Sequence, residues 1–84
     1  MVRMFSGLKK TRNRVVGTKQ TLQALTRNNV KLVFLAEDTD QHLKEEIIRT
    51  TRKHHVPVEM VESRLKLGRA CGIDVAAACA ALLE

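Results

Sequence analysis

Apolar residues follow two different patterns along the chain, and the two patterns alternate. Val30–Ala36 gives the strongest strand signal, because Leu32–Ala36 is continuously apolar, as in a strand covered on both faces. Leu43, Ile47 and Thr51 recur at helical spacing, which is typical of a helix with one buried face. The predicted strands are Arg14–Val16, Val30–Ala36, Val58–Val61 and Ala76–Leu83, and the predicted helices lie within Met1–Asn13, from Thr18 to about Asn28, from Thr39 or Asp40 to about His54, and from Ser63 to about Gly72.

Residues that favour helix ends stand at the predicted boundaries. Asn28 and Gly72 are predicted to end helices, because asparagine and glycine tolerate the left-handed backbone that follows a last turn. Serine, threonine and aspartate favour the first position, because their side-chain oxygens accept hydrogen bonds from the N–H groups of the first turn. The predicted N-caps, in chain order, are Thr18, either Thr39 or Asp40, and Ser63.

The segment Ala76–Leu83 carries conflicting signals. Five of the six residues from 76 to 81 are alanine, which favours a helix by intrinsic propensity. The alternation of strands and helices before it favours a last strand instead, buried between helices that need small side chains to approach closely. We predict the strand, and the helix stays open as an alternative.

The order of elements predicts a single domain over residues 1–84. The predicted fold is α/β: a three-layer α/β/α sandwich around a four-stranded, mostly parallel mixed sheet. Right-handed crossovers place strand-to-helix junctions at one edge of such a sheet, where ligands usually bind. We therefore expect Gly17–Thr21, Val61–Ser63 and Gly72–Val75 to lie side by side.

The charge distribution indicates an acidic partner. Residues 1–36 contain eight basic residues and no acidic one, whereas residues 37–84 contain seven basic and nine acidic residues. This asymmetry favours nucleic acid, although a solvated basic face gives the same composition. The longest apolar run, Val75–Leu83, has nine residues and is too short to cross a bilayer, so we expect a cytoplasmic protein without a membrane partner.

The sequence offers little support for enzymatic or metal chemistry. Cys71 and Cys79 belong to no CxxC or Cys/His ligand pattern, so we interpret both as reduced core side chains. His42, His54 and His55 share no metal-ligand spacing, and no nucleophile with a matching base is visible. We predict no enzyme, no metal site and no cofactor. The alternative from another class is a small nucleotide-binding regulatory domain.

The candidate site is the junction where Arg14–Val16 meets Gly17 and then a helix start. Glycine turns the backbone without a Cβ penalty, and a helix N-terminus presents unpaired N–H groups that attract phosphate. Lys19 and Gln20 project from the first turn, where side chains can reach base edges. The junction lies in the basic part of the chain, which suits a nucleic-acid ligand.

Two segments carry a family resemblance: VGTKQTLQAL over residues 16–25 and LGRACGIDVAA over residues 67–77. Together they resemble the ribosomal protein family of L-seven-Ae and L-thirty-e, in particular its small bacterial members that bind kink-turn RNA. The resemblance extends from about Arg14 to Leu83. It implies binding to an RNA helix that bends sharply at a bulge followed by sheared G·A pairs.

The resemblance also implies roles for individual residues. Lys19 would donate to guanine O6 or N7, Gln20 would accept from a guanine amino group, and the backbone at Gly17 and Thr18 would hold phosphate. A second loop would cover the extruded bases by apolar contact. The residues of that loop are Ile73, Asp74 and Val75 together with Val61, Glu62 and Ser63, and the further phosphate contacts would come from Arg14, Arg27 and Arg69.

The chain departs from the archaeal pattern of this family at the readout positions. Archaeal members carry Asn-Glu where this chain has Lys19-Gln20, and Lys where it has Gln23, which changes the hydrogen-bonding groups offered to RNA. We expect a monomer whose partner is an RNA with a kink-turn, in the ribosome or a riboswitch. A general basic ribosome-associated protein without kink-turn specificity is the second alternative.

Overall fold

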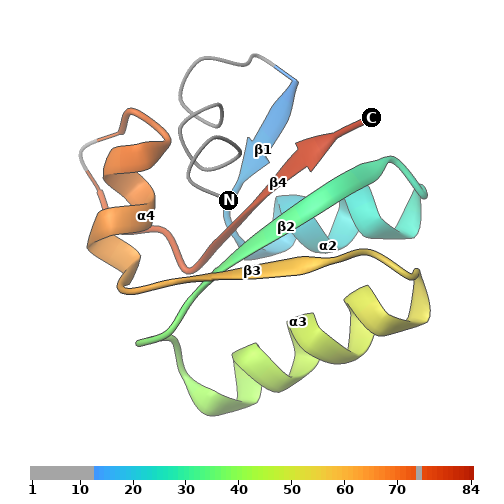
Figure 1. Ribbon diagram of the computed structural model, residues 1–84, viewed down its shortest axis with the longest axis horizontal. Helices are drawn as coiled ribbons and strands as arrows, with labels where there is room; N and C mark the ends of the chain where they lie inside the picture. The colour runs from blue at the N-terminus through green and yellow to red at the C-terminus, as the bar shows by residue number, and fades with distance from the viewer. Residues whose placement is uncertain (1–12, 74) are drawn as a thin grey trace.

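The computed structural model describes residues 13–73 and 75–84. The elements follow one another as β1 (Arg14–Val16), α2 (Thr18–Thr26), β2 (Val30–Ala36), α3 (Gln41–Lys53), β3 (Val58–Val61), α4 (Arg64–Ala70) and β4 (Cys79–Leu83) (Figure 1). These elements match the predicted order. The helix predicted within residues 1–13 falls almost entirely outside the described residues.

The four strands form one mixed sheet in the order β1-β4-β2-β3. β2 and β3 pair in parallel, while β4 runs antiparallel to both of its neighbours, β1 and β2. The strands β1, β2 and β3 therefore point the same way, and the last strand inserts between two of them in the opposite direction. The predicted four-stranded mixed sheet is confirmed, but it is not mostly parallel, because two of its three pairings are antiparallel.

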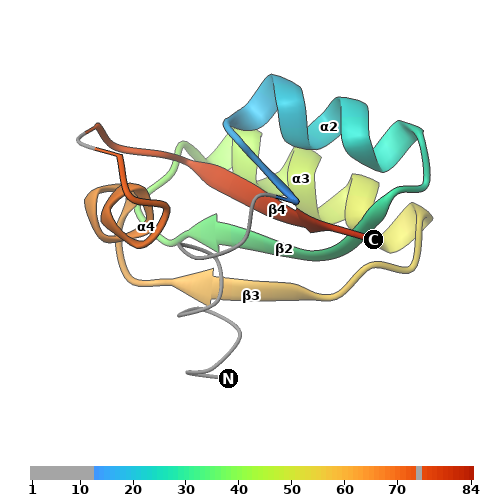
Figure 2. The ribbon, with the colours of Figure 1, turned by 90° about the horizontal axis from the view of Figure 1, so that it is seen from above.

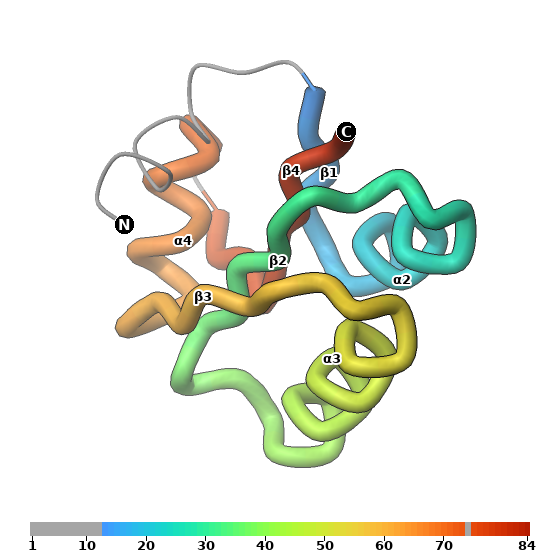
Figure 3. Tube along the Cα trace, turned by 45° about the vertical axis from the view of Figure 1, so that its right-hand side comes forward, coloured from blue at the N-terminus to red at the C-terminus, as the bar shows by residue number. Residues whose placement is uncertain are grey.

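Helices cover both faces of this sheet, and together with it they make three layers (Figure 3). On one face, Phe34 and Ala36 of β2 pack in a cluster with Leu67 of α4. On the other, Val33 and Leu35 pack in a cluster with residues of α2 and α3. Successive side chains of a strand point to opposite faces, so the continuous apolar run of β2 supplies both clusters.

The alanine-rich segment forms a strand that begins at Cys79 rather than at Ala76. Cys79, Ala80 and Ala81 are all fully buried in the middle of the sheet. Their small side chains leave room for the layers on either face, and this tertiary packing overrides the helix propensity of alanine.

The predicted N-caps of α3 and α4 are confirmed. Asp40 caps α3 by accepting from Leu43 N–H at 3.4 Å, and Ser63 caps α4 by accepting from Lys66 N–H at 3.0 Å. The left-handed backbone predicted at Asn28 and Gly72 is also present, with φ of 55° and 82°. None of the helices in the described part of the chain is long and apolar enough to span a membrane.

Candidate nucleic-acid interface

The turn between β1 and α2 depends on Gly17. Its φ of 109° and ψ of 158° lie in a region that only glycine adopts without strain. Gly17 N–H donates to the carbonyl oxygen of Cys79 at 2.9 Å, and Thr21 N–H donates to the carbonyl oxygen of Gly17 at 3.0 Å. The start of α2 is thereby fixed against the start of β4.

Thr18 does not cap α2, so that prediction is wrong. Gly17 holds the N-cap position, Thr18 is the first helical residue, and no described side chain caps the helix. The Thr18 hydroxyl instead lies 3.8 Å from Cys79 Sγ, which donates to it. Unlike the capped starts of α3 and α4, the first N–H groups of α2 keep their capacity to bind an anion.

The two cysteines are free and buried, as the core interpretation requires. Burial raises the pKa of the Cys71 thiol, and the nearby charge of Arg14 opposes this only in part. Burial also raises the pKa of the Cys79 thiol, and the neighbouring Thr21 and Thr18 hydroxyls oppose this only in part. Both thiols therefore stay protonated and unreactive at neutral pH.

Lys19 and Gln20 are exposed on the first turn of α2. The Gln20 amide folds back over the turn, because a Cβ added to Gly17 would lie 2.9 Å from Gln20 Oε1. Glycine at position 17 thus provides the backbone conformation and also leaves space for this amide. The two side chains offer an ammonium donor and an amide acceptor next to the uncapped helix start.

The loop after α4 lies directly against that helix. Ile73 N–H donates to Gly68 O at 3.1 Å, and Ala77 N–H donates to Arg64 O at 3.0 Å. A Cβ on Gly68 would stand 2.0 Å from the carbonyl oxygen of Val75, so only glycine permits this approach. Ile73 packs against the core, whereas Val75 is 64% exposed. Asp74 lies outside the described residues.

The segment between β3 and α4 is mostly structural. Val61 is buried, and its carbonyl oxygen accepts from Glu37 N–H at 2.7 Å. Glu62 accepts from Lys66 Nζ at 2.7 Å, and this hydrogen bond and the charge of Lys66 lower the pKa of Glu62. With the Ser63 hydroxyl engaged as a cap, all three predicted site residues of this segment already have partners within the protein.

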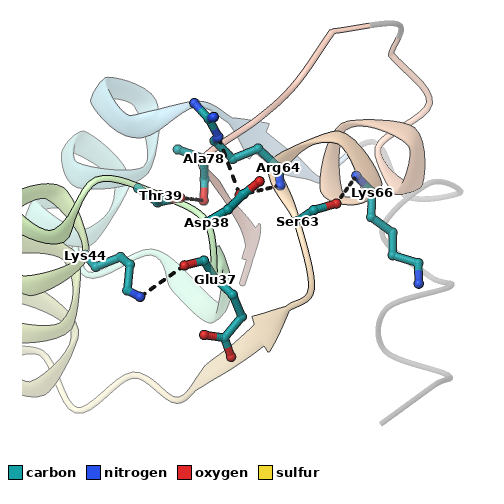
Figure 4. Close-up of polar contacts among 8 residues, drawn as sticks. All are labelled: Glu37, Asp38, Thr39, Lys44, Ser63, Arg64, Lys66 and Ala78. Atoms are coloured by element: carbon teal, nitrogen blue, oxygen red, sulfur yellow. Dashed lines mark hydrogen bonds and ion pairs between the residues drawn. The ribbon is translucent and has the colours of Figure 1, made fainter.

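The loop between β2 and α3 joins the site, although the sequence analysis did not include it. Figure 4 shows Asp38 Oδ1 accepting from Arg64 N–H, at 2.8 Å, with Arg64 Nε at 3.4 Å. Thr39 is buried and its hydroxyl donates to Ala78 O at 3.5 Å, while Lys44 Nζ donates to Glu37 O at 3.1 Å. The sequence could have indicated this loop, because it also follows the carboxyl end of a parallel strand, where ligands usually bind.

The three candidate arginines lie in different surroundings. Arg14 Nη2 donates to Cys71 O at 2.8 Å, which ties β1 to the end of α4. Arg69 is exposed in the last turn of α4. Arg27 is the C-cap of α2, so it lies at the opposite end of that helix from Lys19.

The structure therefore brings the predicted segments together at one edge of the sheet (Figures 1 and 2). Direct hydrogen bonds link Gly17 to β4, Glu37 to β3, and Arg64 to the loop that precedes β4. Within the described residues, no group of three His, Cys, Asp or Glu side chains could hold a metal ion. We call this surface the junction edge; it comprises Gly17–Gln20, Glu37–Thr39, Glu62–Arg64, Ile73 and residues 75–78.

Comparison with known proteins gives the family. A model of the ribosomal protein L7Ae/L30e/S12e/Gadd45 family matches residues 4–84. A protein of Bacillus pumilus named "RNA-binding protein" is 41% identical over 69 residues, which cover 82% of this chain and 84% of the relative. "RNA-binding protein YbxF" of Geobacillus stearothermophilus is 44% identical over 70 residues, covering 83% and 85%. The resemblance drawn from two sequence segments is thus confirmed.

Solved structures show the same fold. A protein of unknown function from Bacillus halodurans superposes with a TM-score of 0.87 at 25% identity, covering 100% of this chain and 87% of that one. The 15.5kD RNA binding protein of Giardia lamblia superposes with a TM-score of 0.89 at 22% identity, covering 99% and 72%. At this identity the second likeness is one of fold alone.

Proposed function

Since the chain belongs to the ribosomal protein L7Ae/L30e/S12e/Gadd45 family, we propose that it binds kink-turn motifs in structured RNA. In this proposal it recognises the bend and its sheared G·A pairs and stabilises the kinked form, as a cytoplasmic monomer without catalytic activity. The observation that carries the proposal is the 2.9 Å bond from Gly17 N–H to Cys79 O, which holds an uncapped helix start beside β4 and the loop before it. The names of the bacterial relatives support an RNA partner.

The first turn of α2 is the proposed reader of the sheared pairs. Lys19 donates to O6 or N7 of a guanine in the groove, and Gln20 accepts from a guanine amino group through Oε1. The Gly17 N–H of the predicted phosphate site is engaged by Cys79 O. The N–H groups of Thr18 and of Lys19 therefore hold the adjacent phosphate, with the positive end of the helix behind them. The exposure of Lys19 and Gln20 supports this role, because neither side chain is packed in the core.

Val75 is the proposed apolar contact for a base extruded from the bulge. It is the most exposed large apolar side chain among the described residues, and Gly68 holds its backbone against α4. Ile73, Val61 and Ser63 have partners within the protein, and in this proposal they support this loop and the start of α4. Arg69 remains a proposed contact to phosphate. Asp74 remains a proposed RNA contact of the loop.

Recognition by shape and groove contact suits this chain better than stacking on exposed rings. Phe5 and Phe34 are its two aromatic residues. Phe34 is fully buried, so it offers no ring to a base, and Phe5 lies outside the described residues. Single-strand binding of the stacking type needs such rings at the surface.

The test compares two RNAs of equal length at physiological salt. One contains a kink-turn and the other is an unbent duplex, and a gel-shift titration measures both dissociation constants. We expect the kink-turn to bind at least about tenfold more tightly, because base-edge contacts and the bend add to phosphate contacts. Donor and acceptor dyes on the two helix ends report the kink on binding.

Each other outcome overturns the proposal. Equal affinity for the two RNAs would indicate a general basic ribosome-associated protein. Saturable binding of ATP or GTP in calorimetry, without RNA preference, would indicate a nucleotide-binding regulatory domain.

A further inference from the structure

A second group of basic residues lies at the end of the molecule opposite the junction edge. Here α2 and α3 end and β2 and β3 begin, and the two turns lie side by side in the views of Figures 1 and 2. We call this surface the distal edge; it comprises Arg27, Asn28, Lys31 and Arg52–Pro57, with Glu84 beside them.

The backbone of the distal edge is fixed by two left-handed residues and a bond between the turns. Asn28 and His55 have φ of 55° and 58°. His54 Nδ1 lies 2.9 Å from Asn28 Oδ1. An amide oxygen only accepts, so the imidazole donates through Nδ1 and its Nε2 stays available for another contact.

Lys31 is presented to solvent by an irregularity in the sheet. Val30 pairs with Leu83 and Leu32 pairs with Leu82, so the register shifts and Lys31 is the extra residue of a bulge. Val30 and Leu32 are buried on either side of it, while Lys31 is exposed. With Asn28, His54 and His55, Lys31 lines a cavity of about 240 Å³.

The charges of the distal edge are not neutralised within the described part of the chain. Two ion pairs are present in the described part of the chain, Arg64 with Asp38 and Lys66 with Glu62, and both lie at the junction edge. Arg27, Arg52 and Lys53 stand near the negative ends of helix dipoles, which stabilise them modestly. Lys31 lies on a strand, so no helix dipole accounts for it, and Glu84 is the one carboxylate that lines the cavity.

We propose that the distal edge binds the phosphate backbone of a second RNA segment while the junction edge holds the bend. The choice of RNA as the polyanion rests on the proposed function. An acidic protein fits less well, because interfaces between proteins centre on apolar side chains. The exposed large apolar residues of the described chain are Met60, Leu65 and Val75, and none belongs to the distal edge.

The two edges are far enough apart for two RNA segments. The molecule measures 29 × 27 × 21 Å along its principal axes. Along α2, the eight steps from Lys19 to the C-cap Arg27 span about 12 Å, at a rise of about 1.5 Å per residue. One RNA helix at the junction edge therefore leaves the distal edge open to solvent. The protein is a bridge between neighbouring parts of a folded RNA.

The experiment measures binding of a second RNA to the complex. The full chain is saturated with a short unlabelled kink-turn RNA, and a labelled unbent duplex is titrated in, with anisotropy as the readout. We expect the duplex to bind, and to bind about tenfold more weakly in the double variant Lys31→Gln/Arg52→Gln. Each lost phosphate contact also lowers the slope of log affinity against log salt by about 1.

The matched control is Arg49→Glu, which changes the net charge by the same two units at an exposed position of α3 away from both edges. This control should bind the duplex within about twofold of the unmodified chain, and thermal melting should show both variants folded. Glu84→Gln should strengthen duplex binding by about twofold, because it removes a negative charge that repels the RNA phosphates.

The inference is overturned if kink-turn RNA abolishes duplex binding, if the control and the distal double variant lose affinity equally, or if polyglutamate competes as well as RNA does. Its failure is separable from failure of the proposed function. If the chain does not prefer a kink-turn but duplex binding still depends on Lys31 and Arg52, only the proposed function falls. If the kink-turn preference holds and the distal variant binds as the unmodified chain does, only the distal edge falls.

Discussion

The junction edge and the distal edge handle charge in opposite ways. At the junction edge, carboxylates stand beside the basic residues: Asp38 pairs with Arg64 and Glu62 with Lys66. At the distal edge, Lys31 and Glu84 line the cavity, and the ion pairs of the described residues include none of Arg27, Lys31, Arg52 and Lys53. Paired charges fix loop geometry and attract a polyanion weakly, whereas unpaired charges attract phosphate without specifying a shape. We infer that the junction edge would determine which RNA shape is bound, and that the distal edge would add affinity for phosphate without specifying a shape.

The two edges also differ in how closely their backbones approach. At Gly17 of the junction edge, and at Gly68 in the helix behind its loop, a Cβ would meet another group, at 2.9 Å and 2.0 Å. At the distal edge the left-handed turns are made by Asn28 and His55, which carry side chains. The junction edge is therefore the more sensitive of the two to substitution.

Gly68→Val gives the largest expected effect. Its Cβ would overlap the carbonyl oxygen of Val75, and a backbone atom cannot move aside as a side chain does. We expect a loss of about 3 kcal/mol in the free energy of unfolding, at the upper end for overpacking. Urea denaturation measures it, with Arg69→Val at an exposed neighbouring position as the control. Equal losses in the two variants would show that the close approach does not matter.

Lys19→Ala and Lys31→Ala separate the two edges by function. Lys19→Ala should weaken kink-turn binding by about 1–3 kcal/mol, as expected for loss of one base-edge contact. Lys31→Ala removes the same side chain from the other end and should leave kink-turn affinity nearly unchanged. Gel-shift titrations of both variants against one short kink-turn RNA measure the difference.

Two results would contradict the predicted difference between Lys19→Ala and Lys31→Ala. If Lys19→Ala binds the kink-turn as tightly as the unmodified chain, the assignment of the first turn of α2 is wrong. If the two variants lose affinity equally, the lysines contribute only net charge.

The fold was largely readable from the sequence, because its signals were local. The apolar run of β2, the caps at Asp40 and Ser63, and the left-handed Asn28 and Gly72 all act through neighbouring residues. The strand order was not readable in this way. Placing β4 between β1 and β2 depends on pairing over long separations, to which local propensity is blind.

The grouping of the candidate segments was readable from the sequence, whereas the contacts of individual side chains were not. Parallel strand direction groups Gly17 with the segments that follow β2 and β3. The loop after α4 joins them because β4 runs antiparallel and therefore begins at the same edge. The side-chain roles depend on tertiary contacts that no spacing reveals: Thr18 turns toward Cys79, Arg14 bonds to Cys71 O, and Val61 enters the core. The charge count also misled, because Arg27 lies at the distal edge although it belongs to the basic half of the chain.

Ser63→Ala should cost about 1 kcal/mol of stability, as for loss of an N-cap. The Ser63 hydroxyl accepts from Lys66 N–H at 3.0 Å at the start of α4. Asp40→Ala is the matched change at α3, where the cap bond is longer at 3.4 Å. We expect thermal melting to show similar or smaller loss there, with kink-turn affinity reduced only by Ser63→Ala, because α4 supports the loop of Val75.

The smallest expected effect is a pH dependence at the junction edge. Lys66 lowers the pKa of Glu62 below its ordinary value of 4.5. A lowered folded-state pKa means that the stabilisation is present above the unfolded-state value and is lost as pH falls through the folded-state value. The chain should therefore melt slightly above the Glu62→Gln variant at pH 7 and low salt, with the gap closing at pH 3 and in high salt. A gap that persists at pH 3 would mean that Glu62 acts through packing rather than through its charge.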